Sequence, residues 1–365
     1  MPKPSKSDAK SSRARASSRR PRDNAFVALV KSVQKKSEPR LRRLLQARLS
    51  ASRRYAPEVQ ALVGSVSELT LRGGKRLRPA LVAVGLRAAD EAGDLDRAVD
   101  LGLSLEMLHT YLLIHDDWMD GDLVRRGGPT VHRLLAQHFR SEAQGEKSAV
   151  LAGDYALGVA LELFRTASEG PHQSELLSIF TRMHEDAIFG QQLDIAARSP
   201  DPEIVYALKT GSYTVNGPLA TGAMLGGGSP GLLSVLERFS RPAGIAFQLR
   251  DDLLGAFGDP ARTGKPLGSD LTAGKYTLLV KFGLKSSKPA ARSALRKAFG
   301  NADASSADIE KALAALEQSG AKAAVEARIL ALCGEARREL ASRTVKPKGR
   351  ELLEGALEAL AERPL

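Results

Sequence analysis

The feature of this sequence that most constrains its fold is an apolar stripe with the spacing of an α-helix. Its leucines recur at intervals of three and four residues, at Leu101, Leu105, Leu108 and Leu112. Such spacing places side chains on one face and predicts an amphipathic helix packed against a core. The segment 155–164 (YALGVALELF) repeats the pattern, whereas alternating β-branched runs are hard to find. The sequence therefore predicts an all-α fold.

Gly and Pro gather at short breaks between the predicted helices, at 72–79, 125–130, 216–222, 225–231 and 257–268. No fixed-period repeat and no shift in composition divides the chain. We therefore expect a single domain over residues 26–365, in which the Ala- and Glu-rich stretch 285–365 serves packing rather than chemistry.

The formal charge of +12 at pH 7 invites a nucleic-acid partner, but most of the excess lies in one short segment. Residues 1–22 hold eight Lys or Arg and one Asp, among Ser and Pro and without an apolar period. This composition predicts a disordered basic tail over residues 1–25. The body is only mildly basic, and aromatic residues make up 5% of the chain, which leaves little for base stacking. No specific nucleic-acid partner is expected.

The cellular compartment is indicated by three further properties. No apolar stretch follows the basic tail, so this segment does not have the pattern of a secretory signal. No run approaches the roughly 18 to 20 apolar residues that a transmembrane helix needs. The single cysteine, Cys333, excludes a disulfide framework and is expected to be a small buried residue. We therefore expect a cytoplasmic protein without a transmembrane segment.

The apolar stripe runs directly into a cluster of carboxylates at Asp116, Asp117, Asp120 and Asp122. Asp116 and Asp120 are four residues apart and stand about one turn from each other on the same helix face. Like charges in that relation destabilise a helix by about 0.2–0.5 kcal/mol unless a cation lies between them. A solvated helix end would also explain this pattern, which alone is weak evidence for a metal site.

A second apolar helix pattern ends in the same way, at Asp251 and Asp252 in FQLRDDLLGAFGD. Two such pairs can face one another across a helical bundle and form a metal site. Oxygen-only ligands favour Mg²⁺, which completes its shell with water and substrate phosphates. Gly255 stands four residues after Asp251, so the second helix offers fewer ligands. The predicted metal-site residues are Asp116, Asp117, Asp120, Asp251 and Asp252, with Asp117 in a supporting position.

Lys and Arg residues lie beside each Gly-rich break that is near an acidic motif: Lys75, Arg76, Arg78, Arg125, Arg126, Lys209, Lys265 and Lys275. Each one alone would be a solvated surface charge. Together with Mg²⁺ they suit a diphosphate, because metals bridge its oxygens and guanidinium groups bind them in bidentate fashion. No GxxxxGK(S/T) loop and no GxGxxG after a strand is present, so a nucleotide-binding fold does not explain this chemistry.

These motifs resemble those of the trans-isoprenyl diphosphate synthase (polyprenyl synthetase) family. The matching segments follow the family's order from residue 72 to 275: GGKRLRP, HTYLLIHDDWMDGDLVRRGGPTVH, LAGDY, GQQLD, KTGSYT, FQLRDDLLGAFGD and TGKPLGSDLTAGK. The resemblance implies an all-α, isoprenoid-synthase-type helical bundle around a central active-site cavity, in a homodimer. It also implies head-to-tail condensation of isopentenyl diphosphate with dimethylallyl, geranyl or farnesyl diphosphate.

The resemblance also implies roles for individual residues. The catalytic set would be Asp116, Asp120, Asp251, Lys209 and Arg125, with the aspartates binding three Mg²⁺ ions and Asp194 supporting them. The residues that would hold the allylic diphosphate are Arg125, Lys209, Thr210, Gln248, Lys265 and Lys275. Those that would hold isopentenyl diphosphate are Lys75, Arg78, His109 and Arg126. Metal and cationic side chains would stabilise the departing diphosphate, so no nucleophilic Ser or Cys is required.

Product length depends, in this family, on the residues before the first aspartate motif. Leu108, Tyr111 and Leu112 lie eight, five and four positions before Asp116 and would line the path of the growing chain. An aromatic residue five positions before an uninserted DDxxD resembles geranylgeranyl (C20) synthases, whereas one four positions before would indicate farnesyl (C15) synthases. A role of Tyr111 in core packing alone, and a C15 or longer product, remain open.

Two other classes of protein share some of these motifs. A class I terpene cyclase has DDxxD and an all-α fold, but it carries an NSE-type second metal motif and needs no isopentenyl diphosphate site. A non-catalytic regulatory homologue would be expected to lose its metal aspartates, yet Asp116, Asp120 and Asp251 are all present. Both alternatives fit the motifs less well than a synthase does.

Overall fold

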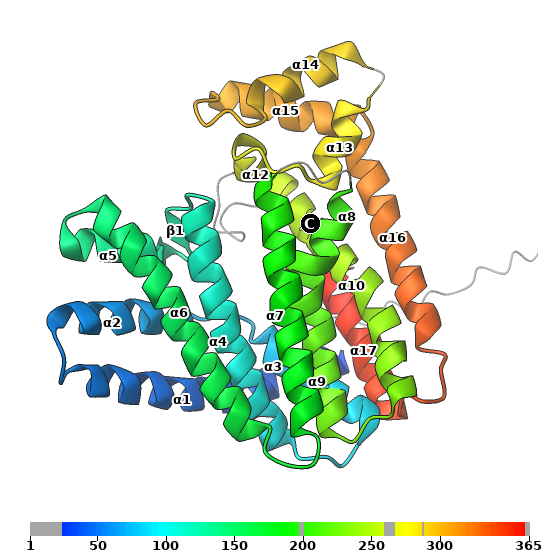
Figure 1. Cartoon of the computed structure of the whole chain (residues 1–365). Helices are drawn as coiled ribbons and strands as arrows, with labels where there is room; N and C mark the ends of the chain where they lie inside the picture. Colours follow the sequence, from blue (N-terminus) through cyan, green and yellow to red (C-terminus); the bar gives the residue numbers. More distant parts are fainter. Residues whose placement is uncertain (1–23, 197–200, 259–266, 287, 362–365) are drawn as a thin grey trace, which may run out of the picture.

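The computed structural model describes residues 24–196, 201–258, 267–286 and 288–361. Over these residues the chain is a bundle of helices with one short hairpin, so the predicted all-α fold is confirmed (Figure 1). The predicted basic tail lies outside the described residues except for its last two positions, where Asn24 caps the first helix and Ala25 begins it. A single domain from residue 26 to the C-terminus stays a prediction.

The helices of the first half are α1 (Ala25–Ser52), α2 (Pro57–Leu71), α3 (Leu77–Ala89), α4 (Leu95–Met119), α5 (Val131–Phe139), α6 (Glu142–Ala167) and α7 (Gln173–Ala196). Strands β1 (Val124–Arg125) and β2 (Gly128–Pro129) pair antiparallel between α4 and α5. The second half holds α8 (Pro202–Val205), the π-helix η2 (Tyr206–Asn216), α9 (Gly217–Leu225), α10 (Pro230–Phe257), α12 (Ser269–Thr272), α13 (Leu278–Leu284), α14 (Pro289–Ala298), α15 (Ser306–Gln318), α16 (Ala321–Glu339) and α17 (Pro347–Ala361). Across the described ranges of the chain, no helix has the length and apolar character needed to cross a membrane.

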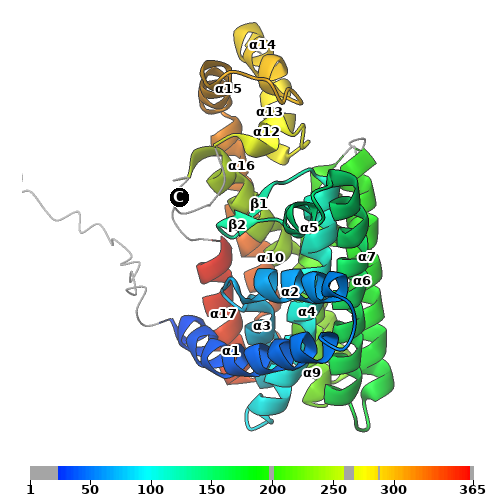
Figure 2. The same ribbon diagram turned by 90° about the vertical axis from the view of Figure 1, so that its left-hand side faces the viewer.

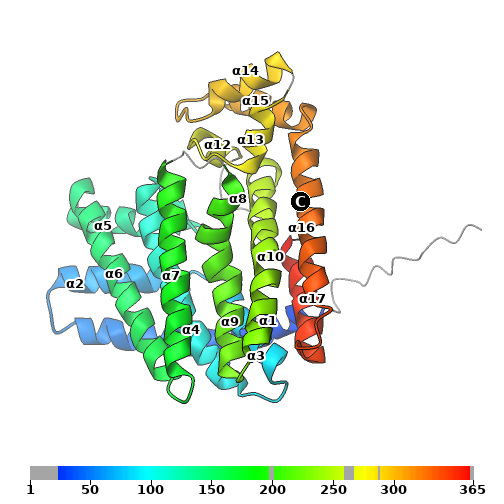
Figure 3. The ribbon, with the colours of Figure 1, turned by 45° about the vertical axis from the view of Figure 1, so that its right-hand side comes forward.

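Long helices run alongside one another across the bundle. Figure 3 shows α7, α9, α10 and α16 in this order, with α14 and α15 packed over one end. Helices α1 and α2 cross the bundle on one side (Figure 2). Helix α3 lies in the interior, and most of its residues from Arg78 to Ala88 are buried, as expected for a helix surrounded by others.

In the predicted core stripes, Leu112 and Leu157 are only partly buried against the core and Leu161 is exposed, whereas the other members are fully buried. Leu101, Leu105 and Leu108 are fully buried in α4, and Phe164 is fully buried in α6. Leu161, which the pattern in 155–164 places with the core residues, is instead 43% exposed. The reason is that α6 lies at the outside of the bundle, so some of its apolar surface has no neighbour among the described residues. Cys333 is buried, as predicted.

Glycines hold the π-helix η2 tightly between its neighbours. A Cβ atom on Gly190 of α7 would lie 2.2 Å from the backbone nitrogen of Lys209, and one on Gly244 of α10 would lie 2.7 Å from Cα of Gly211. π-helical turns are rare and are frequently found at functional sites. The two close approaches fix how η2 presents Lys209 and Thr210 to the interior of the bundle.

Replacing Gly190 with alanine is expected to destabilise the fold by about 1–3 kcal/mol, because the added methyl group forces α7 away from η2. Activity should fall as well, since Lys209 moves with the backbone. The control is Gly334→Ala in α16, where an added Cβ meets nothing within 4 Å. That variant should be neutral or more stable by up to about 1 kcal/mol. Denaturant unfolding measures both, and equal stability of the two variants would contradict the predicted clash.

Candidate active site

A cavity of about 1090 Å³ lies between α4, α7, η2, α10 and the segment 269–277. Most residues selected from the sequence line it: Lys75, Arg78, His109, Tyr111, Leu112, Asp116, Arg125, Asp194, Lys209, Thr210, Gln248, Asp251, Asp252 and Lys275. The selected residues that do not line it are Asp117, Asp120, Arg126 and the fully buried Leu108. Lys265 lies outside the described residues.

Two carboxylates of the first aspartate motif, those of Asp116 and Asp120, pair with lysines from across the cavity. Oδ1 of Asp116 lies 2.9 Å from Nζ of Lys209, and Oδ2 of Asp120 lies 2.7 Å from Nζ of Lys275. Burial alone would raise the pKa of Asp116, but the charges of Lys209, Lys275 and Arg125 hold it below its usual value. Asp116 is therefore a charged carboxylate that faces the amine of Lys209.

Lys209 stands between two acidic groups. Its Nζ donates to Oδ2 of Asp194 on α7 at 2.6 Å, in addition to the ion pair with Asp116 on α4. Burial would lower the pKa of Lys209, but Asp116 and Asp194 raise it above its usual value. The same balance of burial against Asp120 and Asp270 raises the pKa of Lys275. Both amines are consequently positive at neutral pH and available to phosphate oxygens.

Asp117 points away from this group, as its rotation along the helix implies. It is fully buried, and Nε of Arg125 donates to its Oδ1 at 2.7 Å. Burial raises the pKa of Asp117 to about 6, although Arg125 opposes the shift. Arg125 also donates to Asp122 at 3.0 Å. Asp117 therefore orients Arg125 toward the cavity, consistent with its predicted supporting position.

The second aspartate motif is held by a chain of hydrogen bonds. Asp252 accepts from the hydroxyl of Tyr206 at 2.6 Å and from Nε2 of Gln248 at 2.9 Å. Thr210 donates to Oε1 of Gln248 at 2.8 Å, and the Tyr206 hydroxyl accepts from the backbone N–H of Leu278 at 2.9 Å. Burial raises the pKa of Asp252 to about 7, against the lowering effect of its two donors. The network connects η2, α10 and the start of α13.

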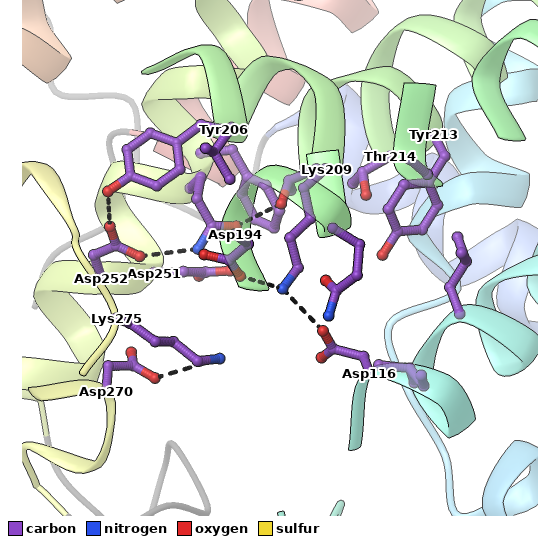
Figure 4. A pocket seen from close by; sticks show the side chains of 18 of the residues that line it. Asp116, Asp194, Tyr206, Lys209, Tyr213, Thr214, Asp251, Asp252, Asp270 and Lys275 are labelled. Carbon is purple, nitrogen blue, oxygen red and sulfur yellow. Dashed lines mark hydrogen bonds and ion pairs between the residues drawn. The ribbon is translucent and has the colours of Figure 1, made fainter. Parts of the chain in front are cut away.

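Tyr206 and Asp270 line the cavity but were not selected from the sequence. A Cβ atom on Gly255 would lie 3.2 Å from Oδ2 of Asp270, so the carboxylate of Asp270 approaches the space that a side chain at 255 would occupy. Figure 4 shows Asp116 on one side of the cavity and Asp251, Asp252 and Asp270 on the other. A signal for Asp270 was present, because it lies in the matched segment TGKPLGSDLTAGK.

The donor set of the cavity fits Mg²⁺ because its candidate ligands are carboxylate oxygens. Within the described ranges, no group of three or more His, Cys, Asp or Glu side chains is gathered into a preassembled metal site. Asp116 and Asp120 are paired with lysines instead. Since Mg²⁺ usually takes one or two carboxylates and fills its shell with water and substrate phosphates, these residues fit a metal that arrives with a diphosphate.

The hairpin after α4 places two arginines in different directions. Arg126 and Gly127 form its turn with φ of 51° and 72°, as in the two-residue turns that join paired strands. Arg125 turns back to Asp117, whereas Arg126 reaches α2, where its Nη1 lies 3.4 Å from the carbonyl oxygen of Leu69. The left-handed backbone at Arg126 is uncommon for a residue with a side chain. It separates the two adjacent guanidinium groups.

A second group of cations surrounds His109. Arg78 donates to Oγ1 of Thr214 at 2.8 Å, and its guanidinium lies 4.5 Å from the ring centroid of Tyr213. Burial and then the charge of Arg78 hold the pKa of His109 well below its usual value, so its imidazole is neutral at neutral pH. Lys75 also lines the cavity. This group is separate from the lysines that pair with the aspartates.

Arg76, the remaining cation of GGKRLRP, does not join this group. It is 2% exposed and pairs with Glu106 at 2.9 Å and Glu38 at 2.7 Å. Its φ of 48° turns the chain at the start of α3 and directs this side chain inward. Arg76 therefore braces the segment that carries Lys75 and Arg78 against α1 and α4.

Known proteins resemble this chain over most of its length. A family model described as polyprenyl synthetase matches residues 59–316. A geranylfarnesyl diphosphate synthase of Aeropyrum pernix is 34% identical over 314 residues, 83% of this chain and 94% of the relative. A geranylgeranyl diphosphate synthase of Saccharolobus solfataricus is 32% identical over 248 residues, 66% of this chain and 71% of the relative. A (2E,6E)-farnesyl diphosphate synthase of Mycobacterium tuberculosis is 37% identical over 212 residues, 57% of this chain and 56% of the relative.

Solved structures also resemble this chain in fold. A geranylgeranyl pyrophosphate synthase from Corynebacterium glutamicum, complexed with isoprenyl diphosphate and magnesium, aligns with a TM-score of 0.84 and 33% identity. The alignment covers 93% of this chain and 99% of that one. The family model, the sequence relatives and the fold agree with the aspartate motifs on both sides of the cavity. This chain belongs to the polyprenyl synthetase family.

Proposed function

We propose that this protein is a Mg²⁺-dependent prenyl diphosphate synthase that joins isopentenyl diphosphate to an allylic diphosphate and forms geranylgeranyl diphosphate (C20). The observation that carries the proposal is the division of the cavity into two regions. Asp116, Lys209 and Asp251 line a charged region. Tyr111 and Leu112 line an apolar region, at least a helical turn before Asp116 along α4. A diphosphate with a hydrocarbon chain matches both regions at once.

The charged region would serve cleavage of the allylic carbon–oxygen bond. When bound, Mg²⁺ would supply the main charge that stabilises the departing diphosphate. Lys209, Lys275 and Arg125 would hold its phosphate oxygens and keep them oriented as the bonding electron pair leaves with the oxygen. Thr210 and Gln248 would fix the position of Asp252 through the hydrogen bonds that they already share.

The second group of cations would hold isopentenyl diphosphate. Lys75 and Arg78, which line the cavity, would bind its phosphates. Arg126 would turn toward them from its place outside the lining, and neutral His109 would add a hydrogen bond without a further charge. The double bond of isopentenyl diphosphate would then attack the allylic carbon, forming the new carbon–carbon bond. The proton lost afterwards would pass to the departing diphosphate, so no side chain needs to act as the base.

We propose Tyr111 as the residue that limits product length. It lines the cavity together with Leu112, whereas Leu108 is fully buried and does not line the cavity. The named relatives include farnesyl, geranylgeranyl and geranylfarnesyl diphosphate synthases, so chain length differs within the family. A farnesyl (C15) or a longer product is the alternative. Further proposals are three Mg²⁺ ions per site and a cytoplasmic location.

A homodimer also belongs to the proposal. Helices α6 and α7 carry exposed large apolar side chains, with Leu151 59%, Leu161 43% and Phe189 52% exposed. Exposed apolar surface that is grouped on neighbouring elements is typical of an interface. Association of two copies through these helices would cover it.

The proposal is tested by incubating purified protein with Mg²⁺, labelled isopentenyl diphosphate and, in turn, dimethylallyl, geranyl and farnesyl diphosphate. Chromatography of the dephosphorylated products gives their chain lengths. We expect incorporation with at least one allylic substrate and a C20 product. An absence of incorporation with all three would contradict the synthase function, and a C15 or longer main product would favour the alternative.

Tyr111→Ala is expected to lengthen the product by at least one isoprene unit, because it removes the ring that ends the apolar region of the cavity. The longer product should become the main species under conditions in which wild type makes C20. Tyr55→Ala is the control, since Tyr55 is 59% exposed and outside the cavity lining. If both variants keep the wild-type product, Tyr111 does not limit chain length.

A further inference from the structure

The ring of Tyr111 is held between two histidines from different helices. Its centroid lies 4.8 Å from that of His115 on α4 and 5.4 Å from that of His184 on α7, and both pairs meet edge to face. Nε2 of His184 lies 3.3 Å from the Tyr111 hydroxyl. Among the residues that the structure describes, His184 is the one hydrogen-bond partner of this hydroxyl. The phenol is therefore fixed at its far end by α7.

His115 is itself fixed by α6. Its Nε2 lies 3.1 Å from the carbonyl oxygen of Val150. Gly153, in the segment LAGDY, provides the space for the ring, because a Cβ atom there would lie 2.1 Å from Nε2 of His115. Tyr111 thus packs against the His115 ring, which is positioned by α6, and is hydrogen-bonded to the His184 ring on α7.

His184 does not line the cavity, although Tyr111 and His115 do. It is therefore behind Tyr111 as seen from the space that a growing chain would fill. Burial lowers the pKa of His184, so at neutral pH its neutral ring offers one donor and one acceptor to the phenol. A residue placed there can influence the cavity through Tyr111 without contact with either diphosphate.

We propose that His184 is a positioning residue for product length, because its hydrogen bond holds the Tyr111 ring across the apolar region of the cavity. The inference rests on the proposed synthase function and extends it to a residue outside the cavity. Without the hydrogen bond, the ring turns aside more often and lets a longer chain pass. Loss of a neutral hydrogen bond of this kind shifts the equilibrium between the ring across the cavity and the ring turned aside by about fivefold.

The test measures the ratio of longer to wild-type product in four variants. His184→Leu keeps a similar volume but cannot form a hydrogen bond, and His184→Gln can still form one. We expect about a fivefold higher ratio in His184→Leu and in Tyr111→Phe, and a near wild-type ratio in His184→Gln. The double variant His184→Leu with Tyr111→Phe should not exceed either single variant, because both remove the same bond.

His138→Leu is the matched control, because His138 is an exposed histidine on α5 and should leave the ratio unchanged. Unchanged ratios in His184→Leu and Tyr111→Phe, or additive effects in the double variant, would overturn the inference and leave the synthase function intact. If His184→Leu fails to fold, the ratio in Tyr111→Phe decides. Wild-type protein that forms no product would overturn the proposed function itself.

Discussion

Replacing Asp116 with asparagine is expected to lower the rate of condensation by about 10²–10³-fold. Asparagine keeps the volume of the side chain and removes its charge. In the proposed function this loss would weaken binding of Mg²⁺ beside the diphosphate, and it would leave Lys209 paired with Asp194 alone. Product formation at saturating substrates measures the rate, and a titration with Mg²⁺ should show a higher metal requirement for any residual activity.

The control for this variant is Asp96→Asn on the same helix. Asp96 lies at the start of α4, where its side chain is 52% exposed and pairs with Lys36 and Arg40. Exposed ion pairs of this kind contribute about 0–1 kcal/mol, so the control should fold normally and keep its activity. A similar small effect in both variants would show that Asp116 is not a metal ligand. Circular dichroism confirms that both proteins are folded.

The helices and the first aspartate motif could be predicted because both are local patterns. Helix spacing places Asp116 and Asp120 on one face, and in the structure each of these two carboxylates pairs with a lysine. The partners of the second motif could not be found from local spacing. Tyr206 contacts Asp252 across 46 residues and Leu278 across 72, so only the folded bundle brings them together.

Adjacent residues of the same charge also proved to have different surroundings. Lys75 lines the cavity, whereas Arg76 is buried against Glu106 because the backbone turns between them. Asp116 faces the cavity, whereas Asp117 is buried against Arg125. Neither difference is visible in the motifs, since the first depends on a turn with positive φ and the second on which helix face is buried. Charge in the sequence predicted the candidate site, whereas packing determines the orientation of each charged side chain.

Lys209→Met is expected to lower kcat/KM for the allylic substrate by about 10²–10³-fold. Methionine keeps most of the length of the side chain but leaves Asp116 and Asp194 without the cation between them. The two carboxylates then repel a diphosphate that Lys209 would otherwise attract. Because Lys209 would hold the allylic diphosphate in the proposed function, KM for isopentenyl diphosphate should change much less. Steady-state kinetics with each substrate varied in turn separates the two effects.

The matched control is Lys281→Met on α13. The Lys281 side chain is 17% exposed, close to the 22% of Lys209, and it pairs with Asp201 at 3.4 Å. It does not belong to the cavity lining, so loss of its charge should leave both KM values near wild type. Equal losses in the two variants would mean that removing any half-buried lysine damages the fold. A loss confined to Lys209→Met, and to the allylic substrate, would instead identify Lys209 as a cation that the diphosphate meets directly.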